Sequence, residues 1–248
     1  MPKMCLIDMA VGKSGDLSKW TQSKLYAVLG IDISKDNILN SKDGACVRYI
    51  NEMSKSNREK LPICMFIHGD TSKYIENGDF EKIDENNNEY NTGYSSHHIM
   101  KALMGSRDVK SENLEPFLKK YHGIFENKFD ICSIQFAIHY MFEDKIKLHQ
   151  FLTNVSKYTK TGGYFIGTCY DGKKIYDMLK ENDESELWID KTKIWHIKKK
   201  YKDSNETFLN DNVDSLGFKI SVYQESINKE FDEYLVNFNF LVKIMNDY

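Results

Sequence analysis

The stretch FDICSIQFAIHY, from Phe129 to Tyr140, limits what this chain can fold into more than any other. Its apolar run Ile131–Ile134 has the composition of a strand that is buried on both faces. Polar and aromatic side chains follow at once, namely Gln135, Phe136, His139 and Tyr140. A buried parallel strand that ends in such a cluster delivers it to the carboxyl edge of a sheet, where open α/β folds bind their ligands. The alternative is that Phe136 and Tyr140 are two core positions of the next helix.

Apolar runs of strand length recur along the chain and alternate with helical patterns. The other predicted strands of this kind are Met4–Ala10, Leu25–Ile31, Ile63–Ile67 and Tyr164–Thr168. One predicted helix begins at Leu17. The others cover Gly44 to about Arg58, Glu115–Phe125, Phe142–Tyr158 and Lys173–Lys180. Strands that alternate with helices in this way predict a parallel α/β sheet with helices on both faces.

The pattern changes beyond Leu187, where short strands follow one another. The predicted elements here are the strands Trp195–Ile197, Lys219–Tyr223 and Glu233–Val236 and a final helix from Phe238 to Tyr248. They predict a small antiparallel extension of the α/β fold. Residues 77 to about 113 are polar, with one short predicted helix at His97–Met104, and indicate an insertion in a single domain that spans residues 1–248. We expect this domain to be truncated at both ends.

The ends of the first three predicted strands carry residues suited to a nucleoside ligand. Gly12 and Gly15 follow the first strand and allow the backbone to approach a ligand closely. Their G-x-x-G spacing lacks the G-x-G-x-x-G of dinucleotide folds, which argues against hydride transfer. Asp32 lies 24 residues after Asp8, at the tip of the second strand, where it can accept hydrogen bonds from ribose hydroxyls. Its alternative role is a helix N-cap. Asp70, after the third strand, suits the exocyclic amine of a purine or stabilises a turn.

Composition excludes several classes of protein. The net charge of −3 and pI near 6.2 exclude a globally basic surface for nucleic acid, although not a local basic cleft. The 5 cysteines, which have no C-x-x-C spacing, predict reduced thiols in an intracellular protein. The sequence has no signal peptide and no apolar stretch long enough to span a bilayer, so we expect a soluble protein. His97 and His98 have no further ligand at a suitable spacing, so we expect no metal site.

Several segments together resemble the S-adenosylmethionine-dependent methyltransferases, and more closely the mRNA cap guanine-N7 methyltransferase family. These segments are LIDMAVGKSGDLSKW, GIDIS, HGD, FDICSIQFAIHYMFED, NVSKYTKTGGYFIGTCYDG and EYLVNF. The most specific piece is QFAIHYMFED followed by GGYFIGT, and the resemblance extends to the methyltransferase domains of large-DNA-virus capping enzymes. It implies a Rossmann-like sheet. The turn AVGKSG differs from the family's usual GCGKGG, which makes Val11 and Ser14 less permissive positions.

The resemblance implies a role for each matched residue. The methionine and ribose parts of S-adenosyl-L-methionine would be surrounded by Asp8, Ala10, Gly12, Gly15 and Asp32. Its adenine and methyl-donor end would be held by Asp70, Thr71, Gln135 and Phe136. The cap guanine would be held by His139, Tyr140 and Glu233, with Phe136 nearby. If the resemblance is set aside, the alternative for Glu233 is a charged surface residue, and the alternative for His139 and Tyr140 is a pair of core residues with satisfied hydrogen bonds. Lys13 and Lys24 are the candidates for phosphate contacts.

These matches predict methyl transfer from S-adenosyl-L-methionine to N7 of the guanosine cap, GpppN, of mRNA. Guanine N7 carries no proton at neutral pH, so the expected task of His139, Tyr140 and Glu233 is positioning and not acid–base catalysis. The expected partners are capped RNA and other capping domains, in cis or in a partner subunit. The alternatives are a non-catalytic cap- or cofactor-binding module and a small-molecule methyltransferase. The expected compartment is the cytoplasm (host cytoplasm or virion for a viral protein) or the nucleus for a cellular homologue.

Overall fold

The apolar runs of the sequence form the strands of a central sheet in a computed structural model of the chain. The structure describes residues 3–55, 61–83, 94–109, 114–202 and 206–248. The chain forms two compact units. The first unit comprises Met1–Gln135 and Thr153–Ile166, and the second comprises Phe136–Leu152 and Gly167–Tyr248.

The first unit contains a five-stranded sheet with the strand order β3-β2-β1-β4-β5. Its strands are β1 (Cys5–Asp8), β2 (Ala27–Asp32), β3 (Ile63–His68), β4 (Phe129–Gln135) and β5 (Thr159–Thr168), whose last residues belong to the second unit. Strands β3, β2, β1 and β4 are parallel, and every residue of β1 and β2 is buried. The predicted parallel α/β sheet is therefore confirmed. Strand β1 ends before the predicted Ala10 because the Ala10 amide donates to the Asp8 carboxylate, which turns the chain.

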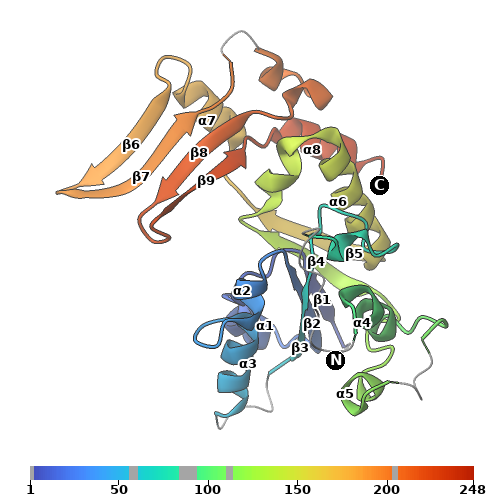
Figure 1. The fold of residues 1–248 in the computed structure, drawn as a ribbon. Coiled ribbons are helices and arrows are strands. Elements are labelled where there is room, and N and C mark those ends of the chain that lie inside the picture. The colour runs from blue at the N-terminus through green and yellow to red at the C-terminus, as the bar shows by residue number, and fades with distance from the viewer. Residues whose placement is uncertain (1–2, 56–60, 84–93, 110–113, 203–205) are drawn as a thin grey trace. The chain divides into compact units, whose positions relative to one another are not determined.

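Helices cover both faces of this sheet (Figure 1). Helices α1 (Leu17–Gln22), α2 (Lys35–Leu39) and α3 (Ala45–Met53) lie on one side, and α4 (Ser96–Leu103) and α5 (Pro116–Lys120) lie on the other. Leu17 and Trp20 of α1 pack against Leu6 and Val28 of the sheet. The predicted helices from Gly44 and from Glu115 are both shorter than expected. The predicted insertion at 77–113 lies partly outside the described residues, and its predicted helix corresponds to α4.

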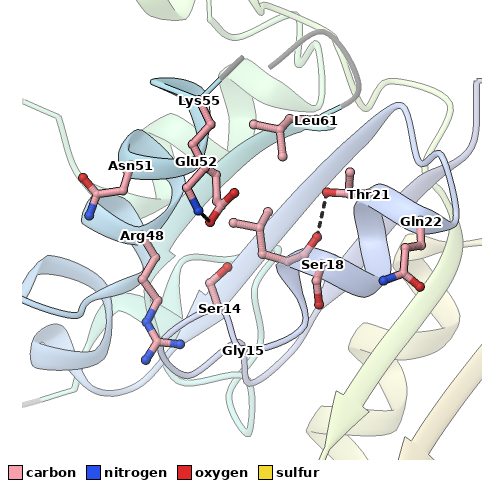
Figure 2. Close-up of a pocket in the computed structure, with 11 residues that line it drawn as sticks. Ser14, Gly15, Ser18, Thr21, Gln22, Arg48, Asn51, Glu52, Lys55 and Leu61 are labelled. Carbon is pink, nitrogen blue, oxygen red and sulfur yellow. Dashed lines mark hydrogen bonds and ion pairs between the residues drawn. The ribbon is translucent and has the colours of Figure 1, made fainter. Parts of the chain in front are cut away.

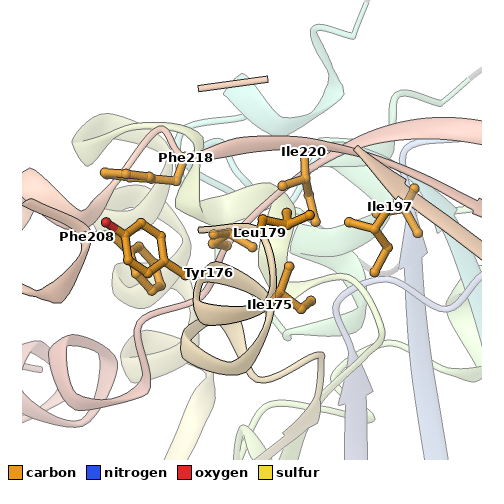
Figure 3. Close-up of a cluster of buried hydrophobic side chains, with 9 residues drawn as sticks. Ile175, Tyr176, Leu179, Ile197, Phe208, Phe218 and Ile220 are labelled. Carbon is orange, nitrogen blue, oxygen red and sulfur yellow. The ribbon is translucent and has the colours of Figure 1, made fainter. Parts of the chain in front are cut away.

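The second unit is built on an antiparallel sheet with the strand order β6-β7-β8-β9. Its strands are β6 (Glu184–Ile189), β7 (Thr192–Lys199), β8 (Lys219–Gln224) and β9 (Lys229–Tyr234). Helix α7 (Gly172–Met178) packs on one face, where Ile175, Tyr176 and Leu179 meet Ile197, Ile220 and Phe218 (Figure 3). The predicted antiparallel extension is thus present. It contains one strand that the sequence did not indicate, β6, and its last strand is β9 and not Glu233–Val236.

The second unit also contains the stretch that follows β4. Residues Ile138–Glu143 form a 3-10 helix, and α6 (Lys145–Tyr158) begins after it and ends in the first unit. The predicted start of this helix at Phe142 is wrong, because Asp144 accepts the amides of Ile146 and Lys147 and so caps the helix there. The unit further contains the 3-10 helices Glu206–Leu209 and Val213–Ser215 and helix α8 (Phe238–Met245). Within the described residues, no helix is long and apolar enough to cross a membrane.

Candidate functional site

The carboxyl edge of the parallel sheet gathers the polar residues that the sequence placed at strand ends. Asp8 ends β1, Asp32 ends β2 and Gln135 ends β4. Asp70 and Thr71 follow the end of β3 at His68. Because these four strands are parallel, the five side chains belong to the same edge, as the pattern predicted.

Asp32 joins the glycine turn after β1 to the end of β2. Its buried carboxylate accepts the Gly12 amide at 2.7 Å, the Ser34 amide at 2.9 Å and the Asn37 side-chain amide at 3.0 Å. The alternative role as a helix N-cap is wrong, since Ser34 caps α2 by accepting the Asn37 amide. A carboxylate has about four acceptor positions, so Asp32 retains one for a ligand. Anchoring of the glycine turn is a function of Asp32 that the sequence did not indicate.

Asp8 is a buried carboxyl group at the same edge. Asp8 is 2% exposed. Among the described residues, only the Ala10 amide donates a hydrogen bond to its carboxyl group, at 3.1 Å. Burial, together with the nearby carboxylates of Asp16 and Asp32, raises the pKa of Asp8 to about 7. A cationic group bound next to Asp8 would favour its ionised form.

Two residues of the glycine turn, Gly12 and Ser14, have left-handed backbone conformations, and only one of them is a glycine. Gly12 has φ +54°, and a side chain would fit there sterically but would strain the backbone. Ser14 has φ +60°, a conformation that costs an L-residue free energy. The Ser14 Oγ is buried and has no hydrogen-bond partner among the described residues. Gly15 faces open space.

A cavity of about 720 Å³ opens beside this turn, between α1 and α3 (Figure 2). Ser14 and Gly15 line it on one side and Arg48 on the other. The Arg48 guanidinium makes no hydrogen bond or ion pair with any described residue. The sequence analysis did not single out Arg48 or this cavity, since an arginine on a helix face is usually solvated.

Asp70 and Thr71 make internal contacts. The Asp70 carboxylate accepts the amide and the hydroxyl of Ser72 at 3.0 and 2.6 Å, so it stabilises a turn. The Thr71 hydroxyl is buried and donates to the Met9 carbonyl at 2.7 Å, which ties the end of β3 to the end of β1. The Gln135 side-chain amide donates to the Ser133 hydroxyl at 3.0 Å.

The two candidate phosphate contacts differ in position. Lys13 follows β1, but its ammonium pairs with both Asp43 carboxylate oxygens at 2.8 Å and lies 3.9 Å from Asp36. Lys24 precedes β2 and therefore lies at the amino end of that strand, at the opposite edge from Asp32. Lys24 is therefore far from the strand-end residues and does not suit the phosphate role for which it was a candidate, because α1 brings the chain back to the start of the next parallel strand.

In the second unit, His139 and Glu233 form a buried pair. His139 lies in the 3-10 helix and is 5% exposed, and Glu233 lies in β9 and is 9% exposed. The His139 Nε2 is 3.6 Å from a Glu233 oxygen, too far for a hydrogen bond. Among the described residues, neither ring nitrogen of His139 nor the Glu233 Oε2 has a hydrogen-bond partner. Glu233 is therefore not a surface charge, and His139 is not a satisfied core residue.

Burial sets the charge of this pair. It lowers the pKa of His139 to about 4 and raises the pKa of Glu233 to about 7. His139 is thus neutral at pH 7, and the pair is not an ion pair. Burial and then the Glu233 charge raise the pKa of Tyr140 to about 12, and the same two causes raise the pKa of Tyr170. Glu233 is therefore flanked by two phenols.

The cavity beside this pair is small. It has a volume of about 10 Å³ and is lined by His139, Glu233 and Tyr170, with α7 and β9 around it. Such a volume holds about one water molecule and no nucleobase. A base can reach the unpartnered atoms only if the surrounding side chains move. Tyr170 is a residue of this cavity that sequence reasoning missed, although it lies two residues after the end of β5.

Phe136 and Tyr140 are not core residues. Phe136 is 67% exposed and Tyr140 is 39% exposed, and the Tyr140 ring centroid lies 4.3 Å from that of His139. The alternative that they are core positions of a helix is therefore wrong. Phe136 also has φ +52°, and its amide donates to the Thr168 carbonyl at 2.9 Å. A strained, exposed aromatic residue is more typical of a binding site than of a packed core.

Comparison with known structures defines the class of the fold. A solved S-adenosylmethionine-dependent methyltransferase from Clostridium acetobutylicum superposes with a TM-score of 0.50 at 16% identity, covering 98% of this chain and 72% of the other. Together with the sheet order, this likeness places the chain in the S-adenosylmethionine-dependent methyltransferase fold.

Sequence comparison defines the family within this class. The mRNA (guanine-N(7))-methyltransferase domain model matches residues 1–101 and 75–248, and the chain belongs to this family. It is 29% identical over 186 residues to mRNA cap guanine-N(7) methyltransferase 1 of Oryza sativa, covering 75% of this chain and 38% of that protein. It is 27% identical over 250 residues to a probable mRNA-capping enzyme of Acanthamoeba polyphaga mimivirus, covering 98% of this chain but 18% of that protein. The chain therefore spans well under half the length of these relatives.

Proposed function

We propose that this chain methylates N7 of the guanosine cap of mRNA, with S-adenosyl-L-methionine as the methyl donor. The observation that carries the proposal is the buried pair of His139 and Glu233, which has nitrogen and oxygen atoms without hydrogen-bond partners among the described residues. The chain that contains this pair belongs to the mRNA (guanine-N(7))-methyltransferase family. Buried polar atoms without partners cost free energy, and a ligand that supplies the missing hydrogen bonds recovers it.

The carboxyl edge of the parallel sheet suits the cofactor. Asp32 has one acceptor position left, which suits one ribose hydroxyl and not the two that the sequence alone suggested. Asp8, with its raised pKa, suits the ammonium of the methionine part, because a bound cation favours the carboxylate. Ala10, Gly12 and Gly15 would border the same part. Asp70, Thr71, Gln135 and Phe136 would border the adenine and the methyl-donor end, Thr71 through its backbone because its hydroxyl is already used.

The second unit suits the guanine. The Glu233 carboxylate would accept hydrogen bonds from guanine N1–H and the 2-amino group, and this pairing would lower its pKa. Adenine would leave the carboxylate unpaired, so the same contact would select guanine. Neutral His139 has one donor and one acceptor nitrogen and would complete the hydrogen bonds of the base. The exposed rings of Phe136 and Tyr140 would border the base.

The chemistry asks the protein for alignment and charge stabilisation. When bound, the cofactor supplies an activated methyl group on a sulfonium. Guanine N7 attacks through a lone pair that carries no proton at neutral pH, so no residue acts as a base. The guanine becomes cationic as the bond forms, and the Glu233 carboxylate would stabilise that charge. Exclusion of water would fall to the aromatic residues.

The relatives support a proposal for the wider setting of the reaction. We place the chain as one methyltransferase domain, residues 1–248, that acts beside other capping domains in cis or in a partner subunit. Capped RNA is its proposed substrate, and Lys13 would have to leave Asp43 in order to contact phosphate. The proposed compartment is the cytoplasm or virion for a viral source and the nucleus for a cellular one. Among the described residues, no cluster of His, Cys, Asp and Glu is arranged to hold a metal ion.

The test is a methylation assay with GpppA, ApppA and labelled S-adenosyl-L-methionine, followed by digestion and identification of the methylated base. We expect 7-methylguanine from GpppA and no product from ApppA. Binding of GpppA and of S-adenosylhomocysteine without any turnover would instead support the non-catalytic module. Methylation of small metabolites but not of GpppA would support the small-molecule enzyme.

A further inference from the structure

One face of the antiparallel sheet carries a row of side chains that leads away from Glu233. In β9, Glu233, Phe231 and Lys229 alternate and so share a face, with roughly 7 Å between successive members. In the register of the sheet, Val222 lies opposite Phe231, and Gln224 lies opposite Lys229. Trp195 of β7 lies opposite Gln224. Residues directly opposite each other in an antiparallel sheet share a face, so Trp195 belongs to the same row.

Helix α7 covers only the inner end of this face. Its contacts are with Ile197, Ile220 and Val222 (Figure 3). The half-buried side chains of Tyr170 and Trp195 pack against the margin of this cluster. Beyond the helix the face is open, and Phe231 is 40% exposed. A cavity of about 310 Å³ lies over β7 and β8, and its lining includes Tyr170, Trp195 and Gln224 but not Phe231. This volume is at the low end for ligand sites, which suits one nucleoside.

This open face is continuous with the proposed guanine site. Tyr170 lines both the cavity of about 310 Å³ and the small cavity beside His139 and Glu233. The two cavities and all residues of the row belong to the second unit. A ligand that places one base at Glu233 therefore has a second surface next to it.

We infer that Tyr170, Trp195 and Phe231 form an aromatic platform that stacks the base of the first transcribed nucleotide of the capped RNA. The inference rests on the proposed function, because the cap brings that nucleotide to the site. Aromatic side chains on an open sheet face are a common way to bind single-stranded RNA, and they accept any base because every base has a π-face. The Lys229 ammonium has no ion pair with any described residue and lies beside the platform, where it suits an RNA phosphate.

The experiment compares two probes that share the guanosine and the triphosphate and differ in the presence of a second nucleoside. GTP carries the guanine and three phosphates, and GpppA adds the second nucleoside. Isothermal titration calorimetry measures both affinities for the parent chain and for Trp195→Ala and Phe231→Ala. The matched control is Trp188→Ala: Trp188 is an exposed tryptophan in β6, the Lys193 ammonium lies 5.2 Å from its ring centroid, and it is not among the residues that line the cavity of about 310 Å³.

We expect each platform variant to bind GpppA roughly 5- to 100-fold more weakly, the range for loss of one stacking contact, with GTP affinity unchanged. Trp188→Ala should bind both probes as the parent does. Phe231→Ala removes an exposed ring, so it tests the inference even if Trp195→Ala fails to fold. Unchanged GpppA affinity in Phe231→Ala, or an equal loss for both probes, would overturn the platform. Failure of the parent to bind either probe would instead reject the proposed function.

Discussion

Replacement of Glu233 by glutamine separates two effects of the buried carboxyl group, its cost to the stability of the fold and its proposed contribution to catalysis. Burial raises the pKa of Glu233 from its ordinary 4.5 to about 7. A carboxyl group with a raised pKa destabilises the folded state above its unfolded pKa, because the unfolded chain loses the proton first. The contribution of Glu233 to stability is therefore lost as pH rises from about 4.5 to about 7. Glutamine has the same size and no charge to desolvate.

The size of the effect follows from the gap between the two pKa values. That gap corresponds to roughly 3 kcal/mol at pH 8, and to roughly 1 kcal/mol at pH 5. We therefore expect Glu233→Gln to raise the free energy of unfolding by these amounts. In the same variant, kcat/KM for GpppA should fall roughly tenfold to a thousandfold, since the carboxylate no longer stabilises the charge on guanine.

The assay is urea unfolding followed by circular dichroism at pH 5 and pH 8, with methylation measured on the same preparations. Glu181→Gln serves as the control, because Glu181 is an exposed carboxylate in the same unit and lines neither cavity. A stability gain that is equal at both pH values would refute the account of Glu233 as a desolvated carboxyl. Methylation at the parental rate would refute its role as guanine reader, whatever the stability does.

Three further substitutions test other parts of the structure. Ser14→Gly should raise the free energy of unfolding by about 1 kcal/mol, because it relieves a left-handed backbone and removes a buried unpartnered hydroxyl; Lys24→Gly, which relieves φ +55° without such a hydroxyl, should gain less. Asp32→Asn should lower the free energy of unfolding by roughly 2 kcal/mol and S-adenosylhomocysteine affinity by tenfold or more, since Asp32 anchors Gly12; calorimetry with an unchanged affinity would show that Asp32 only holds the turn. Tyr140→Ala should raise the KM for GpppA about tenfold with cofactor affinity and melting temperature nearly unchanged, and a collapse of the fold would restore the core-residue interpretation.

Sequence patterns predicted the parallel sheet well because its central strands β1 and β2 are buried on both faces. The run Ile131–Ile134 and its polar end identify β4 without further help, since continuous apolar residues of this length have few other uses. Strand β6 was missed because it is an exposed edge strand, with Leu187, Trp188 and Ile189 all open to solvent, so its sequence shows no buried face.

The candidate site was predictable in its residues and not in its bonding. Residues at the ends of parallel strands must gather at one edge, so Asp8 and Asp32 were expected together. The hydroxyl of Thr71 could not be assigned, because its acceptor is the Met9 carbonyl, 62 positions away in the chain. The shifted pKa values of His139 and Glu233 were likewise hidden, since they come from burial that only the packed chain creates.

The path of the chain has a consequence for how this protein can be rearranged. The boundary between the two units is crossed after Gln135, after Leu152 and after Ile166. Neither unit is therefore a continuous stretch of the gene. A breakpoint after Leu152 divides helix α6, and a breakpoint after Ile166 divides strand β5. A single breakpoint after Gln135 would part Asp8 to Gln135 of the proposed cofactor site from the guanine residues His139, Tyr140 and Glu233, but the second product would still carry Thr153–Ile166 of the first unit. Recombination that exchanges the guanine specificity therefore also exchanges part of the unit that would bind the cofactor.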